Sequence, residues 1–182
     1  MTRRDQILRT AAELFARHGY HGVSINDLGA ACGISGPALY KHFRGKQAIL
    51  SEMLVEISDE LLTEGRRRVR EASDDAAALD ALIDWHVGFA LEREPLIVVQ
   101  DREWAALPAE SRERVRETQR KYVEVWVRVL RRLRPERSLR ATRAMVHACF
   151  GLINSTPHSA LTNEAEMREL LASMARAALT VA

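Results

Sequence analysis

The fold of the first part of the chain is decided by residues 33–43, which read Gly-Ile-Ser-Gly-Pro-Ala-Leu-Tyr-Lys-His-Phe. Gly33 favours a tight turn, because glycine tolerates backbone angles that other residues resist. Ser35 can cap the helix that follows, and Pro37 falls in its first turn, where a missing N–H costs little. Leu39 is apolar between polar neighbours, so the short helix can anchor one face and present the other. The pattern predicts the turn and second helix of a helix-turn-helix and indicates DNA as a partner.

Two helices are expected before this turn. Residues 3–18 carry a one-sided apolar stripe at helical spacing, with the capping-box pair Thr2 and Asp5 at its start and Gly19 at its end. Ser24 repeats the capping signal in front of a second, shorter helix. We expect the three helices to share a small core made of Phe15, Ile25, Leu28, Ile34, Leu39 and Phe43.

These elements belong to a longer pattern. It comprises Ile7 to Phe15, Gly19, Gly22-Val23-Ser24-Ile25, Leu28, Gly33-Ile34-Ser35, Leu39-Tyr40, His42-Phe43 and Lys46 through Leu50. With this pattern, residues 7–50 resemble the N-terminal DNA-binding domain of the TetR family of bacterial transcriptional repressors. The resemblance implies an all-α protein with a three-helix DNA-binding domain over residues 1–46 and a helical effector-binding and dimerisation domain over residues 47–182.

Two residues depart from the family pattern. Gly29 stands where the family more often has alanine, and it should lower the stability of its helix. Pro37 replaces the threonine or similar base-reading residue that is common there, so the family gives no rule for the bases this helix reads.

The charge of the chain is uneven. The formal net charge is +2, but the first 46 residues hold seven Lys and Arg against three acids, which makes them +4 and the remainder −2. A basic head on a mildly acidic body suits a phosphate-binding module joined to a domain that does not bind DNA. An ordinary fluctuation of surface charge would give the same asymmetry.

The rest of the chain reads as helices separated by prolines. Apolar stripes at helical spacing cover residues 46–68, 79–90 and 115–133, and the short apolar run 96–99 is interpreted as buried helix because no partner strand exists. The sequence therefore predicts an all-α fold.

The resemblance and the side-chain chemistry together give a set of DNA contacts. Phosphate contacts are expected from the cap residue Ser24, from the hydroxyl of Tyr40 and from the ammonium of Lys46, with Lys41 and His42 extending the basic rim. An alternative is that Tyr40 and His42 are partly buried and only hold the helix. Base reading is expected from the small or apolar residues of the short helix, which favour close backbone approach and methyl contacts. They are Ser35, Gly36, Pro37 and Ala38.

The last two helical stripes indicate self-association. Small residues recur at helical spacing at Ala144, Ala148, Gly151 and Ser155, and an apolar stripe follows at Met167, Leu170, Leu171 and Met174. The resemblance implies that these helices pair with their copies in a second subunit, so that a homodimer reads a palindromic operator. The alternative is that both stripes form the core of a single chain.

An effector site is expected in the middle of the chain. Its candidates are the aromatic and polar residues Trp85, His86, Phe89, Trp104, Tyr122, Trp126, Phe150 and Asn154. An aromatic-lined cavity with few polar groups suits an apolar small molecule, although each residue could equally be plain core. Residues 151–157 resemble the corresponding turn of family members that sense acyl-CoA or other lipid-derived compounds. Our hypothesis is that the ligand shifts the helix starting at Lys46 and releases the DNA.

Other function classes are disfavoured. His147 and Cys149 point to different sides of a helix, His158 lies beyond Pro157, and no catalytic or nucleotide-binding motif appears. We therefore expect no catalytic residue, no metal and no cofactor; a DNA-binding regulator without an effector remains an alternative. Cys32 and Cys149 lack a paired spacing, and there is neither a signal peptide nor a long apolar run, so we expect a cytoplasmic protein without membrane contact.

Overall fold

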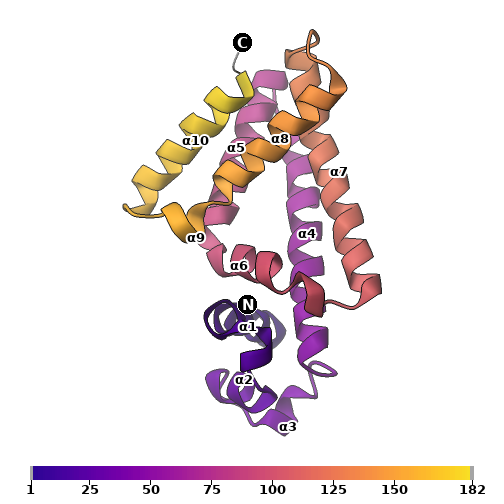
Figure 1. The fold of residues 1–182 in the computed structure, drawn as a ribbon, viewed down its shortest axis with the longest axis vertical. Coiled ribbons are helices and arrows are strands. Elements are labelled where there is room, and N and C mark those ends of the chain that lie inside the picture. Colours follow the sequence, from indigo (N-terminus) through magenta and orange to yellow (C-terminus); the bar gives the residue numbers. More distant parts are fainter. Residues whose placement is uncertain (1, 181–182) are drawn as a thin grey trace. The chain divides into compact units, whose positions relative to one another are not determined.

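The computed structural model describes residues 2–180, and over that range the chain forms helices joined by short loops, with no strand (Figure 1). The prediction of an all-α fold is confirmed. The elements are α1 (Arg3–Gly22), α2 (Ile25–Ala31), α3 (Gly36–Leu39), α4 (Lys46–Glu71), α5 (Asp75–Glu92), α6 (Glu94–Arg102), the 3-10 turn η1 (Trp104–Ala106), α7 (Ala109–Leu133), α8 (Leu139–Ile153), α9 (Thr156–Ser159) and α10 (Glu164–Thr180).

The chain forms two compact units. The first runs through Ile57 and also includes Pro95–Arg116, and the second comprises Ser58–Glu94 and the chain from Glu117 on. The helices α4 and α7 each contribute residues to both units. The domain boundary expected after residue 46 concerns function rather than packing, and it stays a prediction.

The starts of the first three helices follow the sequence signals. The hydroxyl of Thr2 accepts from the N–H of Asp5 at 3.2 Å, and Ser24 and Ser35 cap α2 and α3 in the same way. Gly19 has a positive φ of 74° and breaks the helical path of α1, which resumes and continues to Gly22. The stop predicted at Gly19 is thus a kink, and the helical segment is longer than expected.

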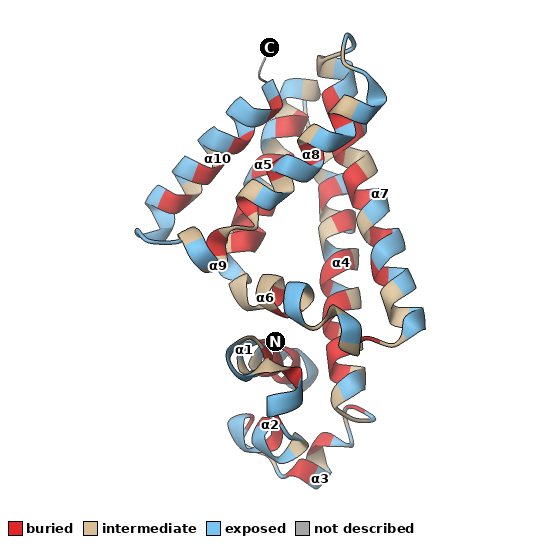
Figure 2. Cartoon of the chain, viewed as in Figure 1, coloured by how far each residue is buried: buried red, intermediate tan, exposed pale blue. Residues whose placement is uncertain are grey.

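The core of the first unit is close to the predicted one. Phe15, Leu28, Leu39 and Phe43 are buried, whereas Ile25 and Ile34 are only half-buried, which corrects their assignment to the core (Figure 2). Further apolar side chains from α1 and α4 complete it, namely Ile7, Ala11, Ile49 and Leu50.

Gly29 marks a close approach of α2 to the turn that follows it. A Cβ at this position would lie 2.9 Å from the carbonyl oxygen of Ile34 and 3.0 Å from the backbone nitrogen of Gly36. Both contacts are with backbone, which cannot swing aside as a side chain can. Glycine is a poor helix former, but the absence of a side chain at this position allows α2 to pack tightly on the turn.

The second unit is built around α5, which is apolar on most of its surface. Its buried residues include Leu82, Ile83 and Val87, and α10 packs against both α5 and α8. At Gly65 of α4, a Cβ would lie 2.6 Å from Cε2 of Tyr122, so the absence of a side chain lets the Tyr122 ring rest on the α4 backbone.

Candidate DNA interface and effector site

Helix α3 is anchored by a buried side chain, and the residues that follow it are exposed. Leu39 is fully buried, whereas the next residue, Tyr40, is 57% exposed, and Lys41 is exposed beside it. Because α3 has only four residues, it offers few side chains for packing, and Leu39 is the large one that is buried. The arrangement presents a phenol hydroxyl and an ammonium to an anionic partner.

The four expected base-reading residues divide by exposure. Ser35 and Pro37 are exposed and Ala38 is half-buried, whereas Gly36 is buried. A Cβ on Gly36 would meet the amide oxygen of Asn26 at 2.2 Å, so this residue faces α2. The groups available to a base edge are therefore those of Ser35 and Pro37, with Ala38 behind them.

Ser24 is exposed, and its hydroxyl is already engaged. It donates to the carboxylate of Asp27 at 2.6 Å and accepts from the Asp27 N–H at 3.1 Å. The hydrogen bond from the Ser24 hydroxyl, together with one from the Ser24 backbone N–H at 2.8 Å, holds the pKa of Asp27 below its usual range, so the carboxylate stays ionised at neutral pH. The phosphate contact expected at Ser24 stays a prediction.

Lys46 caps the end of the first helix. Its Nζ donates to the carbonyl oxygen of Tyr20 at 2.6 Å and to that of Val23 at 2.7 Å, and it lies 4.3 Å from the centre of the Tyr20 ring. The last carbonyls of a helix have no intrahelical partner, so these bonds satisfy groups that the kinked end of α1 leaves open. The DNA contact expected from Lys46 stays a prediction, and at most one of its three N–H groups remains for it.

Replacing Lys46 with methionine should therefore lower the stability of the first unit by about 1–3 kcal/mol, because two carbonyls lose a charged donor. Urea unfolding followed by circular dichroism measures this effect. The matched control is Lys41→Met, since Lys41 is exposed and its replacement should leave stability within about 0.5 kcal/mol. Equal stabilities of the two variants would show that the carbonyl contacts of Lys46 are not structural.

Two further residues, Arg4 and Glu103, hold parts of the first unit together, and the sequence did not reveal them. Arg4 pairs with Glu52 of α4, donates through Nη1 to the carbonyl oxygen of His42 at 2.6 Å and lies 4.2 Å above the Phe43 ring. His42 itself is half-buried beside this contact. No local signal marks the pair, because Arg4 and Glu52 are 48 residues apart.

The second such residue is Glu103, which lies at the kink of α1. Its Oε1 accepts from the backbone N–H of Tyr20 at 2.9 Å, immediately after Gly19 breaks the helix. The two residues are 83 positions apart, so again no local pattern pointed to this contact.

In the second unit, the predicted effector residues gather around His86. The ring of Phe150 stacks on it at 4.5 Å between centroids, with Tyr122 and Phe89 at 5.7 Å and Trp126 edge-on at 5.9 Å. We call these five rings, with Asn154, the aromatic cluster. The structure thus brings together six of the eight residues proposed from the sequence.

The polar atoms of the aromatic cluster form a chain. Nε2 of His86 lies 3.2 Å from Oδ1 of Asn154, and Nδ1 lies 3.3 Å from the hydroxyl of Tyr122. An amide oxygen can only accept, so Nε2 carries the proton and Nδ1 accepts from the phenol. Burial lowers the pKa of His86 to about 4, partly opposed by the hydrogen bond to Asn154, so the ring is neutral at pH 7.

The two remaining tryptophans lie elsewhere. Trp85 packs under the guanidinium of Arg68 at 5.3 Å, and Trp104 belongs to the first unit, where Arg116 lies 5.4 Å from its ring centre. Each indole makes a cation–π contact within its own unit. Trp104 and the aromatic cluster belong to different units, so the expectation that they form one effector site stays a prediction.

The residues expected at a dimer interface divide into exposed and buried sets. On α8, Ala144, Ala148 and Gly151 are exposed and Ser155 is half-buried. On α10 the expected stripe covers two faces. Leu170 and Met174 are 48% and 46% exposed, whereas Met167 and Leu171 are buried in the core of the chain itself. Of these four residues, Leu170 and Met174 are exposed enough to contact a partner directly, and Met167 and Leu171 would lie beneath them.

Cys149 is buried and unpaired, and burial raises the pKa of its thiol to about 12, so it is a poor nucleophile. Among residues 2–180, no three His, Cys, Asp or Glu side chains lie close enough together to hold a metal ion. Within the same range, no helix has the length and apolar character needed to span a bilayer.

Comparison with known proteins gives matches in both halves of the chain. Residues 7–53 match the model of the bacterial regulatory proteins of the tetR family, and residues 72–158 match that of the tetracyclin repressor-like C-terminal domain. The HTH-type transcriptional repressor KstR2 from Rhodococcus jostii (strain RHA1) is 36% identical over 81 residues, which are 44% of this chain and 40% of KstR2. The matched stretch thus spans about two fifths of the length of this curated relative.

Solved structures match over nearly the whole chain. A TetR-family transcriptional regulator from Bordetella parapertussis 12822 is 26% identical with a TM-score of 0.85, covering 97% of this chain and 94% of that one. FadR from Bacillus subtilis in complex with stearoyl-CoA is 17% identical with a TM-score of 0.75, covering 97% of each chain, which shows a shared fold.

Proposed function

Because the chain belongs to the tetR family of bacterial regulatory proteins, we propose that it is a transcriptional repressor, without enzymatic activity, that binds a palindromic operator as a homodimer. A small apolar effector would release it from the DNA. The observation that carries this proposal is the recognition helix α3, anchored by fully buried Leu39 beneath exposed Tyr40 and Lys41. An exposed aromatic hydroxyl next to an ammonium, in the turn that follows α3, suits the DNA backbone.

In the proposed complex, Tyr40 and Lys41 contact phosphates and Ser35 and Pro37 meet base edges. The pyrrolidine ring of Pro37 offers apolar surface, which suits the methyl group of thymine in the major groove. Two copies of the unit related by a twofold axis would read half-sites about one helical turn apart. The partner surface would consist of the small residues of α8 together with Leu170 and Met174 of α10.

The proposed effector site is the aromatic cluster. Its rings are apolar, and its polar atoms belong to neutral groups, so it suits a ligand with a long apolar part and an uncharged hydrogen-bonding group. The same fold in Bacillus subtilis FadR binds stearoyl-CoA, which favours an acyl-CoA or another lipid-derived compound. That the effector of this chain is an acyl-CoA or another lipid-derived compound is part of the proposal.

Release would pass through α4. This helix contributes residues to both units, and its Gly65 lies against the Tyr122 ring. A ligand that displaces Tyr122 would press on the α4 backbone and alter its path. The mechanism requires the ligand to bind the released state more tightly than the DNA-bound state. Operator affinity that stays constant at saturating effector would contradict it.

The first experiment selects fragments of the source organism's DNA on the purified protein at near-physiological salt and footprints what binds. We expect a palindrome whose binding weakens at least about tenfold in a Tyr40→Ala, Lys41→Ala double variant, since two phosphate contacts are lost. The exposed residue Arg131 of α7 supplies the control, Arg131→Ala, which should bind as the wild type does. Lys46 is left intact because its loss would also disturb α1. A folded dimer that enriches no site would contradict the DNA-binding assignment.

A further inference from the structure

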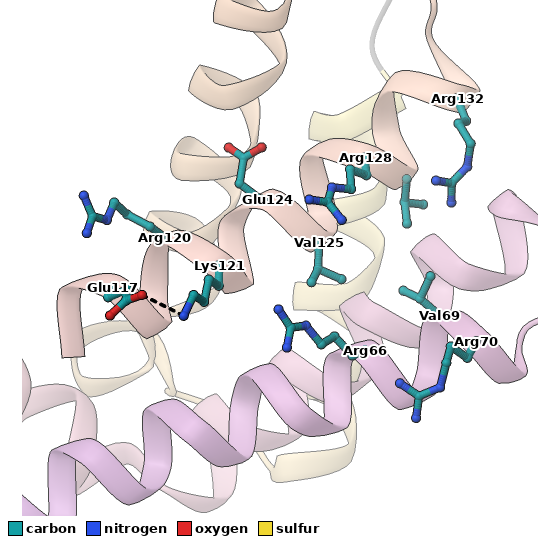
Figure 3. Close-up of a pocket in the computed structure, with 11 residues that line it drawn as sticks. Arg66, Val69, Arg70, Glu117, Arg120, Lys121, Glu124, Val125, Arg128 and Arg132 are labelled. Atoms are coloured by element: carbon teal, nitrogen blue, oxygen red, sulfur yellow. Dashed lines mark ion pairs between the residues drawn. The ribbon is translucent and has the colours of Figure 1, made fainter. Parts of the chain in front are cut away.

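A groove lies between α4 and α7 in the second unit, apart from the aromatic cluster, with which it shares no residue. Its volume is about 570 Å³, and its lining holds six cationic and two acidic side chains (Figure 3). The size lies within the range of small-molecule sites, which is about 300–1,000 Å³. The lining therefore has the dimensions of a ligand site and a strong excess of positive charge.

The two acids do not balance this charge. Glu117 pairs with Lys121 at 2.8 Å, and Glu124 pairs at 2.8 Å with Arg143, which is not part of the lining. The hydrogen bond from Lys121 holds the pKa of Glu117 below its usual range. Glu117 thus neutralises one cation of the lining, Lys121, and Glu124 neutralises none of them.

Three arginines of the lining lack a counter-ion. Within residues 2–180, no carboxylate lies within ion-pair distance of Arg66, Arg70 or Arg128. Arg66 and Arg70 are four residues apart on α4, a spacing at which like charges destabilise a helix. A bound anion would relieve that repulsion.

The floor of the groove is apolar. Val129 is fully buried, and Val69 and Val125 are half-buried, so aliphatic surface lies between the charged groups. Figure 3 shows Arg66 of α4 and Arg128 of α7 at the space between the helices, with Val69 and Val125 beside it, and Lys121 paired with Glu117. Charge and apolar surface are therefore presented together.

We propose that this groove binds an organic polyphosphate, with the phosphates held by Arg66 and Arg128 and an apolar part lying over Val69 and Val125. Guanidinium groups hold phosphates through paired hydrogen bonds, and two arginines without a counter-ion among the described residues match a di- or polyphosphate better than a single carboxylate. Both a free nucleotide and the headgroup of an acyl thioester of coenzyme A carry this chemistry.

The test uses calorimetric titration of the full chain, without DNA, at near-physiological salt. The probes are inorganic pyrophosphate, ADP, coenzyme A and dodecanoyl-CoA. We expect at least one organic polyphosphate to bind, and an Arg66→Ala, Arg128→Ala variant to weaken it by at least about tenfold, since two charged contacts are lost. Arg131→Ala is the matched control, because Arg131 is an exposed arginine of α7 outside the lining. It should bind as the wild type does.

A second variant separates the two sources of the ligand. If the acyl chain lies on the valine floor, dodecanoyl-CoA should bind more tightly than coenzyme A, and Val125→Thr should reduce that difference. Equal binding of ADP and both coenzyme A compounds would assign the groove to the polyphosphate alone. Either result supports the site.

Two outcomes would overturn the proposal. They are the absence of binding by all four probes at millimolar concentration, and equal binding by the wild type and the arginine double variant. Because the titrations contain no DNA, their failure is distinguishable from failure of the repressor assignment.

Discussion

The free energy of unfolding of the second unit should fall by about 3 kcal/mol as the pH is lowered from 6.5 to 4, through the titration of His86 alone. The pKa of this ring is about 4 in the folded chain against 6.5 for a free side chain. Between these values the unfolded chain binds a proton that the folded chain does not, so stability is present above pH 6.5 and is lost as the pH falls. Each pH unit in that window costs about 1.4 kcal/mol.

A His86→Gln variant isolates this contribution from that of the carboxylates. Glutamine keeps a donor for Asn154 and an acceptor for Tyr122 but does not titrate. Urea unfolding at several pH values, followed by tryptophan fluorescence, should show the wild type losing about 3 kcal/mol more than the variant between pH 6.5 and 4. His147→Gln, at an exposed position of α8, is the matched control and should follow the wild type. Parallel pH curves for the wild type and His86→Gln would refute a buried, neutral His86.

Replacing Leu39 with alanine should destabilise the first unit by about 2–5 kcal/mol, the range for removing a fully buried leucine. The four residues of α3 cannot hold a helix by their own hydrogen bonds, so loss of this side chain should release the recognition helix. We expect hydrogen exchange at residues 28–43 to quicken sharply and operator binding to be lost, while exchange in α5 and α8 is unchanged.

The control for this prediction removes the same atoms from an exposed site. Leu161 is 91% exposed, so Leu161→Ala should change stability by less than about 0.5 kcal/mol. If Leu39→Ala kept the exchange protection of the wild type, α3 would be held by something other than its buried leucine, and the geometry proposed for operator reading would be wrong.

The local signals of the sequence predicted the first three helices and the turn before α3 well. Caps at Thr2, Ser24 and Ser35 were confirmed, as were the turn and the burial of Leu39. Each cap depends on residues within four positions of one another, and helix geometry alone fixes such spacings, whereas the burial of Leu39 was expected from its place in the apolar pattern. The overall all-α architecture followed for the same reason.

Of the eight residues grouped from the sequence as an effector site, the structure brings six together, but the sequence did not show how their polar atoms would be arranged. His86 lies on α5, Tyr122 on α7 and Asn154 just after the end of α8, and the chain of hydrogen bonds through the ring depends on the packing of these segments. The pKa of His86 is a consequence of that burial, so it could not be read from a composition or a spacing.

Tertiary structure alone decided where the ammonium of Lys46 points, which face of α10 is buried, and which arginines of α4 and α7 share a groove. Each depends on segments far apart in the sequence, so the positions of whole helices, rather than any local spacing, set the contact. By itself the sequence determined the helices, their caps and the recognition motif, because hydrogen bonds and apolar spacing within a few residues specify them. The partners of its long charged side chains were decided only in the folded chain, since these flexible groups take whichever partners the packing of the helices places within reach.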